Sequence, residues 1–268
     1  MSPSPFRRLA DTLRYAADPV AFAIERLGFN PDPWQAEVLT SPARQQLLNC
    51  TRQAGKSSVA AVKALHVALY TEGALIIVIA PSLRQSRELF GKVVDFLKTL
   101  SPVQVLEEDN RLSLRLANGS RIVALPGDPK TVRGFSAPAL IIEDEAAYLL
   151  DETHTAIRPM LATSGGQLIL MSTPRGRRGH FFEYWQNGGP GWARISVLAA
   201  ECPRISKEFL ESELAALGEW RFKQEYGCAF VETEDSLFQY DLIQSAFSDE
   251  ILPLFTPAEF AALTGGAR

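Results

Sequence analysis

The stretch Leu47-Leu-Asn-Cys-Thr-Arg-Gln-Ala-Gly-Lys-Ser57 joins a short apolar run to a turn of small and polar residues. The amphipathic segment 58–70 follows it, so the predicted order is strand, loop and helix. Such a loop can turn backbone N–H groups inward at a helix N-terminus, where they bind phosphate. Lys56 would neutralise phosphate charge, and the Ser57 hydroxyl would reach a Mg²⁺ ion. The residue types therefore favour nucleotide binding.

The match to the P-loop pattern G-x-x-x-x-G-K-[ST] is imperfect, because Cys50 stands where the first glycine is expected. Gly55-Lys56-Ser57 alone is equally compatible with an ordinary helix N-terminus that follows a tight turn. The other motifs of the chain decide between these interpretations.

Composition and charge indicate an ordinary globular protein. The 268 residues are 46% hydrophobic and 22% charged, which is enough to bury the core of one α/β domain with additions. No apolar run approaches the roughly 20 residues that a membrane span needs, and no apolar h-region follows the N-terminus. We expect a soluble intracellular protein without a membrane partner. The net charge of −4 gives no sign of a broad basic surface, so a DNA partner would be bound locally or by an assembly.

Cysteine and histidine spacing gives no sign of a metal site. The three cysteines are Cys50, Cys202 and Cys228. Their odd number and unpaired spacing fit a reducing compartment and exclude a Cys-based zinc site. The three histidines, also far apart in the sequence, are His66, His154 and His180. We therefore expect no structural metal.

Two helices are predicted before the P-loop. Asp18, Pro19 and Gly28 supply an N-cap, a first-turn proline and a terminator for a short helix between them. Two prolines then enforce an extended approach to Trp34 and Gln35. An aromatic ring beside an amide could stack on an adenine and hydrogen-bond to it. The alternative is a tryptophan that anchors a surface helix.

Continuous apolar runs predict parallel strands that are buried on both faces. The first, residues 74–79, leads to Ser82, which is expected to cap a helix and complete a βαβ unit. Asn118-Gly119, between residues 112–116 and 121–125, predicts a β-hairpin with a type I′ turn at a sheet edge. Further on, residues 192–197 are expected to form a strand and residues 207–226 a helix.

A second chemical motif ends the apolar run that starts at Ala139. Asp144 and Glu145 follow this strand at the edge where open α/β sheets bind ligands. One carboxylate can hold the Mg²⁺ water shell, and the other can orient the attacking water at the γ-phosphate. Together with Lys56 and Ser57, the pair favours a Walker B motif over a solvated acidic turn.

A third apolar run, residues 167–171, ends in Ser172-Thr173-Pro174-Arg175-Gly176. Hydroxyl groups at this strand tip would lie beside the γ-phosphate, where gain or loss of that group can move them. The alternative is a plain turn. The segment from Glu232 to Arg268 resembles an exit linker in composition.

The order of these motifs resembles the ATPase domain of the large terminase subunit of tailed bacteriophages, over roughly Asp18 to Phe238. The elements that carry the resemblance are Pro33-Trp34-Gln35, the Arg-containing P-loop Thr51 to Ser57, Ala80-Pro81-Ser82 with Gln85 and Phe90, Val132-Arg133-Gly134-Phe135, Asp144-Glu145-Ala146 and Ser172 to Gly176. The family tolerates the missing P-loop glycine.

The resemblance implies an α/β fold of the ASCE, RecA-like P-loop NTPase type. Its central sheet would be mostly parallel, flanked by helices and extended by the β-hairpin. The ATPase domain with its N-terminal helical segment would occupy residues 1–240, followed by a linker or tail at 241–268. Family members usually continue into an RNase H-type nuclease domain. This chain stops at Arg268, so we expect that domain to be absent and the chain to lack nuclease activity.

The resemblance also assigns residue roles, with ATP and Mg²⁺ as cofactors. Residues implied in ATP binding are Trp34, Gln35, Thr51, Arg52, Gln53, Ala54, Gly55, Lys56, Ser57 and Ser58. Mg²⁺ is assigned to Ser57 and Asp144, activation of water to Glu145, and coupling of the γ-phosphate to movement to Ser172 and Thr173. Arg133, in a Gly-containing loop before the acidic strand, is expected to act as an arginine finger on a neighbouring subunit. Arg52, acting within its own subunit, is the competing finger.

The function implied by the resemblance is an ATP-driven motor that threads double-stranded viral DNA into a procapsid. Its partners would be DNA, the portal protein and the small terminase subunit. The chain would form a homo-oligomeric ring when assembled, with a monomer in isolation as the alternative. It would act in the cytoplasm of the bacterial host, docked on the procapsid.

Two other functions stay open at this point. A superfamily 2 helicase shares a Gln-bearing upstream motif and similar early strands, but it needs a second RecA-like domain, which no segment after Thr173 predicts. A nucleotide-binding scaffold without turnover is the third possibility, which Lys56, Ser57, Asp144 and Glu145 argue against. A phosphate-release assay separates it from an ATPase.

Overall fold

The computed structural model describes residues 5–100, 105–107 and 112–231. The chain divides into two compact units, residues 1–231 and 232–268. The expected linker at 241–268, and the domain boundary near residue 240, lie outside the described residues.

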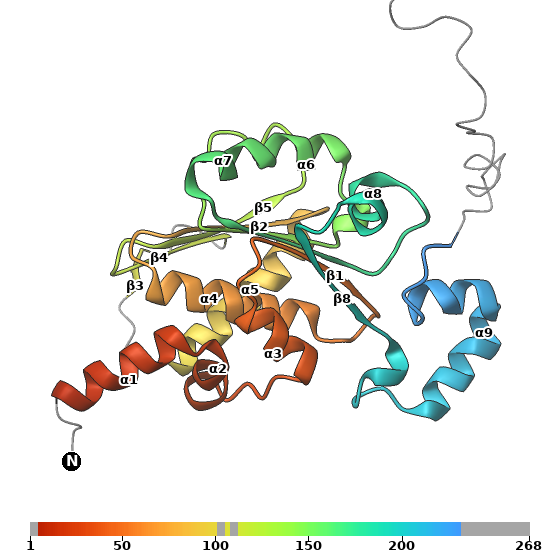
Figure 1. The fold of residues 1–268 in the computed structure, drawn as a ribbon, viewed down its shortest axis with the longest axis horizontal. Coiled ribbons are helices and arrows are strands. Elements are labelled where there is room, and N and C mark those ends of the chain that lie inside the picture. The colour runs from red at the N-terminus through yellow and green to blue at the C-terminus, as the bar shows by residue number, and fades with distance from the viewer. Residues whose placement is uncertain (1–4, 101–104, 108–111, 232–268) are drawn as a thin grey trace, which may run out of the picture. The chain divides into compact units, whose positions relative to one another are not determined.

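In the described part of the chain, eight strands form one sheet in the order β3-β4-β5-β2-β6-β7-β1-β8 (Figure 1). They are β1 (Gln45–Cys50), β2 (Leu75–Ala80), β3 (Val105–Glu107), β4 (Ser113–Leu116), β5 (Arg121–Pro126), β6 (Leu140–Asp144), β7 (Gln167–Ser172) and β8 (Trp192–Val197). The six strands from β5 to β8 in this order are parallel to one another, and β3 and β4 are antiparallel to their neighbours. The mostly parallel sheet and the buried apolar strands are confirmed.

The hairpin is also confirmed, and its second strand joins the main sheet. β4 pairs with β5 in antiparallel register, while β5 pairs with β2 in parallel register. Gly119 has a φ of 82°, a backbone conformation that glycine adopts without a steric cost. The Asn118 side chain accepts from the Ser120 N–H and donates to the carbonyl of Ala68. The hairpin turn is therefore fixed against the helix that follows the P-loop.

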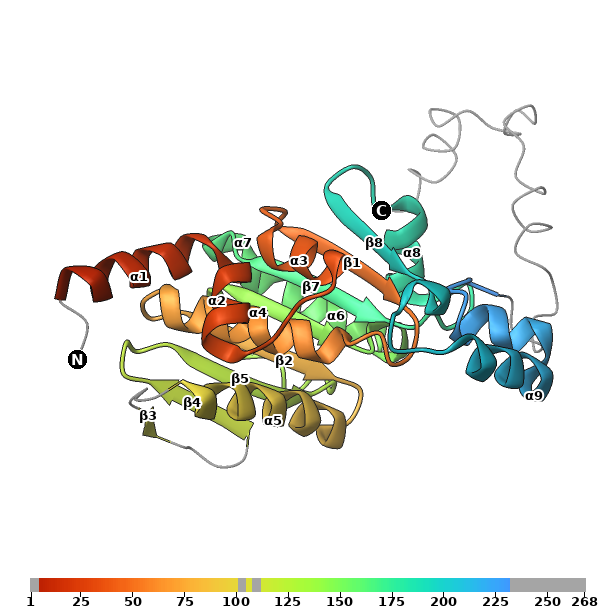
Figure 2. The same ribbon diagram turned by 90° about the horizontal axis from the view of Figure 1, so that it is seen from below.

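One face of the sheet is covered by α1 (Pro5–Ala17), α2 (Pro19–Leu27), α3 (Pro33–Thr40), α4 (Lys56–Tyr70) and α5 (Leu83–Thr99), with α4 and α5 side by side (Figure 2). The other face carries the short helix η2 (Ala146–Tyr148), α6 (Asp151–Ile157), η3 (Arg158–Met160), α7 (Leu161–Ser164) and α8 (Gly179–Asn187). After β8 come η4 (Ala199–Glu201) and α9 (Lys207–Glu225). Among the described residues, no helix is long and apolar enough to span a bilayer.

The predicted helix starts follow the expected capping chemistry. Asp18 accepts hydrogen bonds from the N–H groups of Val20 and Ala21, and Gly28 ends α2 with a φ of 65°. Ser82 and Gln85 form a capping box at the start of α5. The helix expected at 207–226 differs from the prediction, because Gly218 breaks its regular path with a φ of 73° and a ψ of 165°. Glycine adopts this conformation because it has no Cβ.

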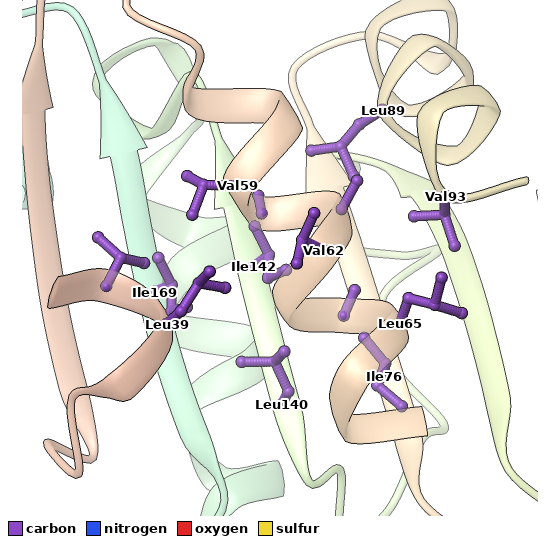
Figure 3. Packing of buried hydrophobic residues seen from close by; sticks show 14 of the residues in the cluster. Leu39, Val59, Val62, Leu65, Ile76, Leu89, Val93, Leu140, Ile142 and Ile169 are labelled. Carbon is purple, nitrogen blue, oxygen red and sulfur yellow. The ribbon is translucent and has the colours of Figure 1, made fainter. Parts of the chain in front are cut away.

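The core has two layers, one on each face of the sheet. Figure 3 shows Val59, Val62 and Leu65 of α4 packed against strand residues that include Ile142. Ile141, the preceding residue of β6, belongs to the second layer, under α6 and α8. Side chains alternate along a strand. Asp144 therefore faces the α4 side, and the buried Glu143 faces the opposite side.

Candidate active site

The P-loop lies beside a cavity of about 730 Å³ at the carboxyl edge of the sheet. The cavity is lined by residues 52–58 and by Gln85, Glu88, Lys92, Glu145, Tyr148, Thr173 and Arg204. Strand register explains the convergence, because Asp144 pairs with Met171 and Asn49 pairs with Ser172. The P-loop, the acidic pair and the segment that starts at Ser172 therefore lie at the same edge of the sheet.

The P-loop backbone depends on two left-handed residues. Gln53 has a φ of 60° and Gly55 a φ of 95°. The φ of Gly55 favours glycine, and a Cβ at this position would also lie 2.7 Å from Nε2 of Gln35, whose side chain would have to shift. Lys56 begins α4, and its ammonium lies 3.3 Å from the carbonyl oxygens of both Cys50 and Thr51. The Lys56 side chain is 7% exposed, and these two contacts hold its ammonium group against the P-loop backbone.

The structure shows why the first P-loop glycine is dispensable. Cys50 is the last residue of β1, and its side chain is fully buried in the core layer under α4. Burial raises the pKa of this thiol, so it is a small apolar side chain rather than a reactive one. All three cysteines are free and buried.

The acidic pair is built on a strained turn. Glu145, directly after β6, has a φ of 51°, which costs a residue other than glycine about 1–3 kcal/mol. Its N–H lies 3.1 Å from Oδ1 of Asp144. Burial, followed by the charge of Glu145, raises the pKa of Asp144 to about 7. A nearby cation would favour the ionised form of this carboxyl group.

The segment expected to couple hydrolysis to movement contacts the candidate catalytic carboxylate. Oγ of Ser172 lies 3.2 Å from Oε2 of Glu145 and 2.6 Å from the carbonyl oxygen of Thr173. Thr173 lines the cavity, together with Tyr148. The guanidinium of Arg175 covers the Tyr148 ring at 4.8 Å from its centroid. The structure thus joins the second and third motifs in one network.

Trp34 and Gln35 support the P-loop from behind and do not line the cavity. Gln35 is 2% exposed, and its Oε1 accepts from the Asp32 N–H. Its Nε2 lies 3.4 Å from the carbonyl oxygen of Gly55. Trp34 packs against the core, and its buried Nε1 has no hydrogen-bond partner in the described part of the chain. The adenine contact of these two residues stays a prediction.

Several cavity residues were not predicted to line the site. Arg204, after η4, donates to both carboxylate oxygens of Asp32 and to the carbonyl oxygen of Ala54 at 2.7 Å. No motif indicated it, because it is brought to the P-loop by β8. Three others lie on α5, and their i, i+3, i+7 spacing could have placed them on one face: Gln85, Glu88 and Lys92.

The two candidate arginine fingers lie in different places. Arg52 is at the rim of the nucleotide cavity and forms an ion pair with Glu225 of α9. Arg133 is exposed and lines a separate cavity against α6, beside Asp151 and Glu152. It makes no hydrogen bond or ion pair with another described residue. The neighbouring Val132 is buried and anchors the loop.

The fold brings together two of the histidines that lie far apart in the sequence, while the expectation of no structural metal stays a prediction. His154 of α6 and His180 of α8 meet at Glu143, and the donor atoms of the three buried residues lie within 4.8 Å of one another. Sequence spacing could not show this, because the residues come from three elements. His66 lies apart, with its Nε2 2.9 Å from the carbonyl oxygen of Tyr15.

Comparisons with known proteins identify the family of this chain. Residues 47–245 match the family described as terminase large subunit, T4likevirus-type, N-terminal. The large terminase subunit of Thermus phage G20c is 26% identical over 250 residues, which cover 80% of this chain and 51% of that protein. The chain thus spans about half the length of this curated relative.

Solved structures show the same fold. The ATPase domain of the Thermus phage P74-26 large terminase superposes with a TM-score of 0.71 at 25% identity, covering 80% of this chain and 99% of that one. The large terminase of a thermophilic bacteriophage, solved in complex with ADP, has a TM-score of 0.63 at 14% identity, covering 75% and 54%. The expected RecA-like P-loop fold is therefore confirmed. Since the family model matches most of the chain, this protein belongs to the phage terminase large subunits, and its described part is their N-terminal ATPase domain.

Proposed function

We propose that this chain binds ATP with Mg²⁺, hydrolyses it, and uses the energy to translocate double-stranded DNA into a procapsid. The observation that carries the proposal is the convergence of Lys56, Glu145 and Thr173 on one cavity at the carboxyl edge of the sheet. Ligands bind at this edge in open α/β sheets. Membership in the terminase family supports the motor role.

The residues present fit a Mg²⁺ ion. Asp144 is 6% exposed, and among the described residues its carboxylate accepts a hydrogen bond only from the Glu145 N–H. Ser57 lies in the first turn of α4 and lines the cavity. A hydroxyl and a carboxylate are suitable Mg²⁺ ligands, because the ion is bound through few protein oxygens and keeps several waters. When bound, Mg²⁺ would neutralise charge on the β- and γ-phosphates.

The chain's own groups would supply the rest of the chemistry. Lys56 and the P-loop N–H groups would hold the triphosphate at the N-terminus of α4. The Glu145 carboxylate would orient the attacking water, because its left-handed backbone turns it toward the cavity. Ser172, within hydrogen-bond distance of Glu145, would respond to loss of the γ-phosphate. This contact would link hydrolysis to α8, which follows the same segment.

The finger is assigned to Arg133 of a neighbouring subunit. Arg133 is exposed and lies outside the nucleotide cavity of its own chain, whereas Arg52 is paired with Glu225. A guanidinium supplied by a neighbour would make hydrolysis depend on ring assembly. The proposed partners are double-stranded DNA, the portal protein and the small terminase subunit, in the cytoplasm of the bacterial host.

A phosphate-release assay with and without Mg²⁺ tests the enzymatic part of this proposal. Wild-type protein should release phosphate from ATP, with stimulation by double-stranded DNA. Lys56→Ala or removal of Mg²⁺ with EDTA should abolish the release. Release that is independent of both would show that the P-loop cavity is not the site of hydrolysis. Strand separation of a DNA duplex without translocation would support the helicase alternative instead.

A further inference from the structure

A buried network lies behind the acidic pair, on the opposite face of β6. Glu143, the residue before Asp144, is fully buried. Its Oε1 lies 2.7 Å from Nδ1 of His154, and its Oε2 lies 2.9 Å from Nε2 of His180. Nδ1 of His180 lies 2.9 Å from Oδ1 of Asp151, which also accepts from the His180 backbone N–H. One carboxylate thus joins β6, α6 and α8.

The hydrogen-bond partners fix the protonation of both rings. Each ring nitrogen of His180 faces a carboxylate oxygen, and an ionised carboxylate only accepts, so both nitrogens carry protons. His154 donates from Nδ1 to Glu143, and its Nε2 lies 3.2 Å from the hydroxyl of Tyr184. That hydroxyl accepts from Arg158 and can donate its own proton to His154. His180 is therefore a cation, and His154 carries a proton on Nδ1.

The charges around His180 are consistent with this assignment. Burial alone would lower the pKa of His180, but the hydrogen bonds and charges of Glu143 and then Asp151 outweigh it and raise the pKa. Burial alone would raise the pKa of Glu143, but the two histidines outweigh it and lower the pKa to about 2. His154 stacks on His180 with ring centroids 4.3 Å apart and an interplanar angle of 11°. Two charged rings would repel at this distance.

A metal ion is the competing interpretation of the three side chains. A shared ion needs lone pairs that converge on one point at about 2.0–2.1 Å from each nitrogen. The two rings are stacked at an interplanar angle of 11°, and each of their nitrogens already has a hydrogen-bond partner. The geometry favours the protonated network.

We propose that His180 is a positioning residue for hydrolysis: bridging Glu143 and Asp151, it fixes the end of β6, from which Asp144 and Glu145 enter the nucleotide site. The inference rests on the proposed ATPase function. His180 is the second residue of α8, a few residues after the Ser172 segment, and Asp151 lines the cavity that contains Arg133. The network would therefore join the acidic pair (Asp144 and Glu145), the coupling segment at Ser172, and the cavity beside Arg133.

Nitrogen-15 NMR of the full chain, labelled in its histidines, tests the bridge without any ATPase assay. The chain has three histidines, and His66→Gln and His154→Gln assign the signals by difference. At pH 7, His180 should carry protons on both ring nitrogens, and His154 should carry a proton on Nδ1. A neutral His180 at pH 7 would overturn the proposal. An equimolar bound metal, with histidine signals that change on EDTA treatment, would overturn it in favour of a metal site.

Asp151→Asn is the variant that separates a charge bridge from simple packing. The asparagine oxygen can still accept from the His180 N–H, and the side chain at 151 is 61% exposed, so folding should be preserved. Removal of one carboxylate should lower the pKa of His180. The charged form exists below that pKa, so the loss of ATPase rate with rising pH should begin at a lower pH in the variant. An unchanged NMR midpoint for His180 would refute the bridge to Asp151.

Kinetics test the positioning role itself. His180→Gln should lower kcat by about 10- to 100-fold and leave KM within about threefold, because the P-loop lies on the other face of the sheet. His66→Gln, which removes another partly buried histidine far from this network, should leave both parameters within about threefold. Wild-type kcat in folded His180→Gln protein would overturn the positioning role. If wild-type protein hydrolyses no ATP, the proposed function fails, whereas the NMR result still decides the bridge.

Discussion

Glu145→Gln should separate ATP binding from ATP hydrolysis. The substitution keeps the size of the side chain, and glutamine can still accept from Ser172, so the strained turn at φ 51° should persist. It removes the negative charge that would orient the attacking water. Loss of a positioned general base costs about 10²–10⁴ in rate, which corresponds to about 3–5 kcal/mol in the barrier.

The affinity of the Glu145→Gln variant for ATP should not decrease, although its rate of hydrolysis does. Glu145 lines the cavity, but in the proposed mechanism the P-loop N–H groups and Lys56 are the groups that bind the phosphates. The charge of Glu145 also contributes to the raised pKa of Asp144. In the variant that pKa should be lower, so Asp144 stays ionised for Mg²⁺. The dissociation constant of ATP should therefore be unchanged or smaller.

Two assays on the same preparations decide this prediction. Titration with a fluorescent ATP analogue gives affinity, and phosphate release gives turnover. Glu219→Gln makes the same chemical change on α9, outside the cavity lining, where Glu219 pairs with Lys223, and should alter turnover by less than about threefold. Loss of ATP binding by Glu145→Gln, as large as that caused by Lys56→Ala, would refute the role assigned to Glu145.

Three further substitutions test separate parts of the site. Lys56→Ala should weaken ATP binding and turnover together, because the lysine neutralises charge in both the ground and transition states; an unchanged dissociation constant would contradict this. Gly55→Ala should destabilise the fold by about 1–3 kcal/mol in chemical denaturation, since a Cβ would meet Gln35 at 2.7 Å. Gly91→Ala, in the open interior of α5, should be neutral or stabilising, and equal effects of the two would disprove the P-loop argument. Arg204→Ala should raise the dissociation constant of ATP about threefold to tenfold, because the substitution leaves the Ala54 carbonyl and the Asp32 carboxylate without their hydrogen-bond donor. An unchanged dissociation constant would show that Arg204 does not support the P-loop.

The sequence predicted the sheet well because its strands are buried on both faces. The predicted strands were the apolar runs at residues 74–79 and 167–171. β2 is shifted by one residue at both ends, and β7 extends one residue further. The helix starts at Asp18 and Ser82 were also predictable, since their caps are local hydrogen bonds. The break at Gly218 in α9 was not anticipated from its sequence.

Only the residues that belong to sequence motifs could be assigned to the candidate site from the sequence. Strand ends that converge at one edge placed Lys56, Glu145 and Thr173 together, as the cavity shows. The sequence could not show that Gln35 lies behind the P-loop or that Arg204 reaches Ala54, since both contacts cross between distant segments. The meeting of His154 and His180 at Glu143 is likewise a product of packing α6 and α8 on one strand.

Ring-dependent hydrolysis is the central claim, and a mixing experiment tests it most directly. Arg133→Ala has an intact nucleotide cavity but no finger, and Glu145→Gln has an intact finger but no water-orienting carboxylate. A finger is worth about 10³–10⁵ in rate, so each variant alone should be nearly inactive. In a random equal mixture, about a quarter of the sites would combine an intact carboxylate with an intact neighbouring arginine.

We therefore predict that phosphate release by the mixture rises far above that of either variant, under conditions in which wild-type protein assembles. A mixture as inactive as its two components would contradict the assignment in trans and would make Arg52, in the P-loop of the same chain, the finger.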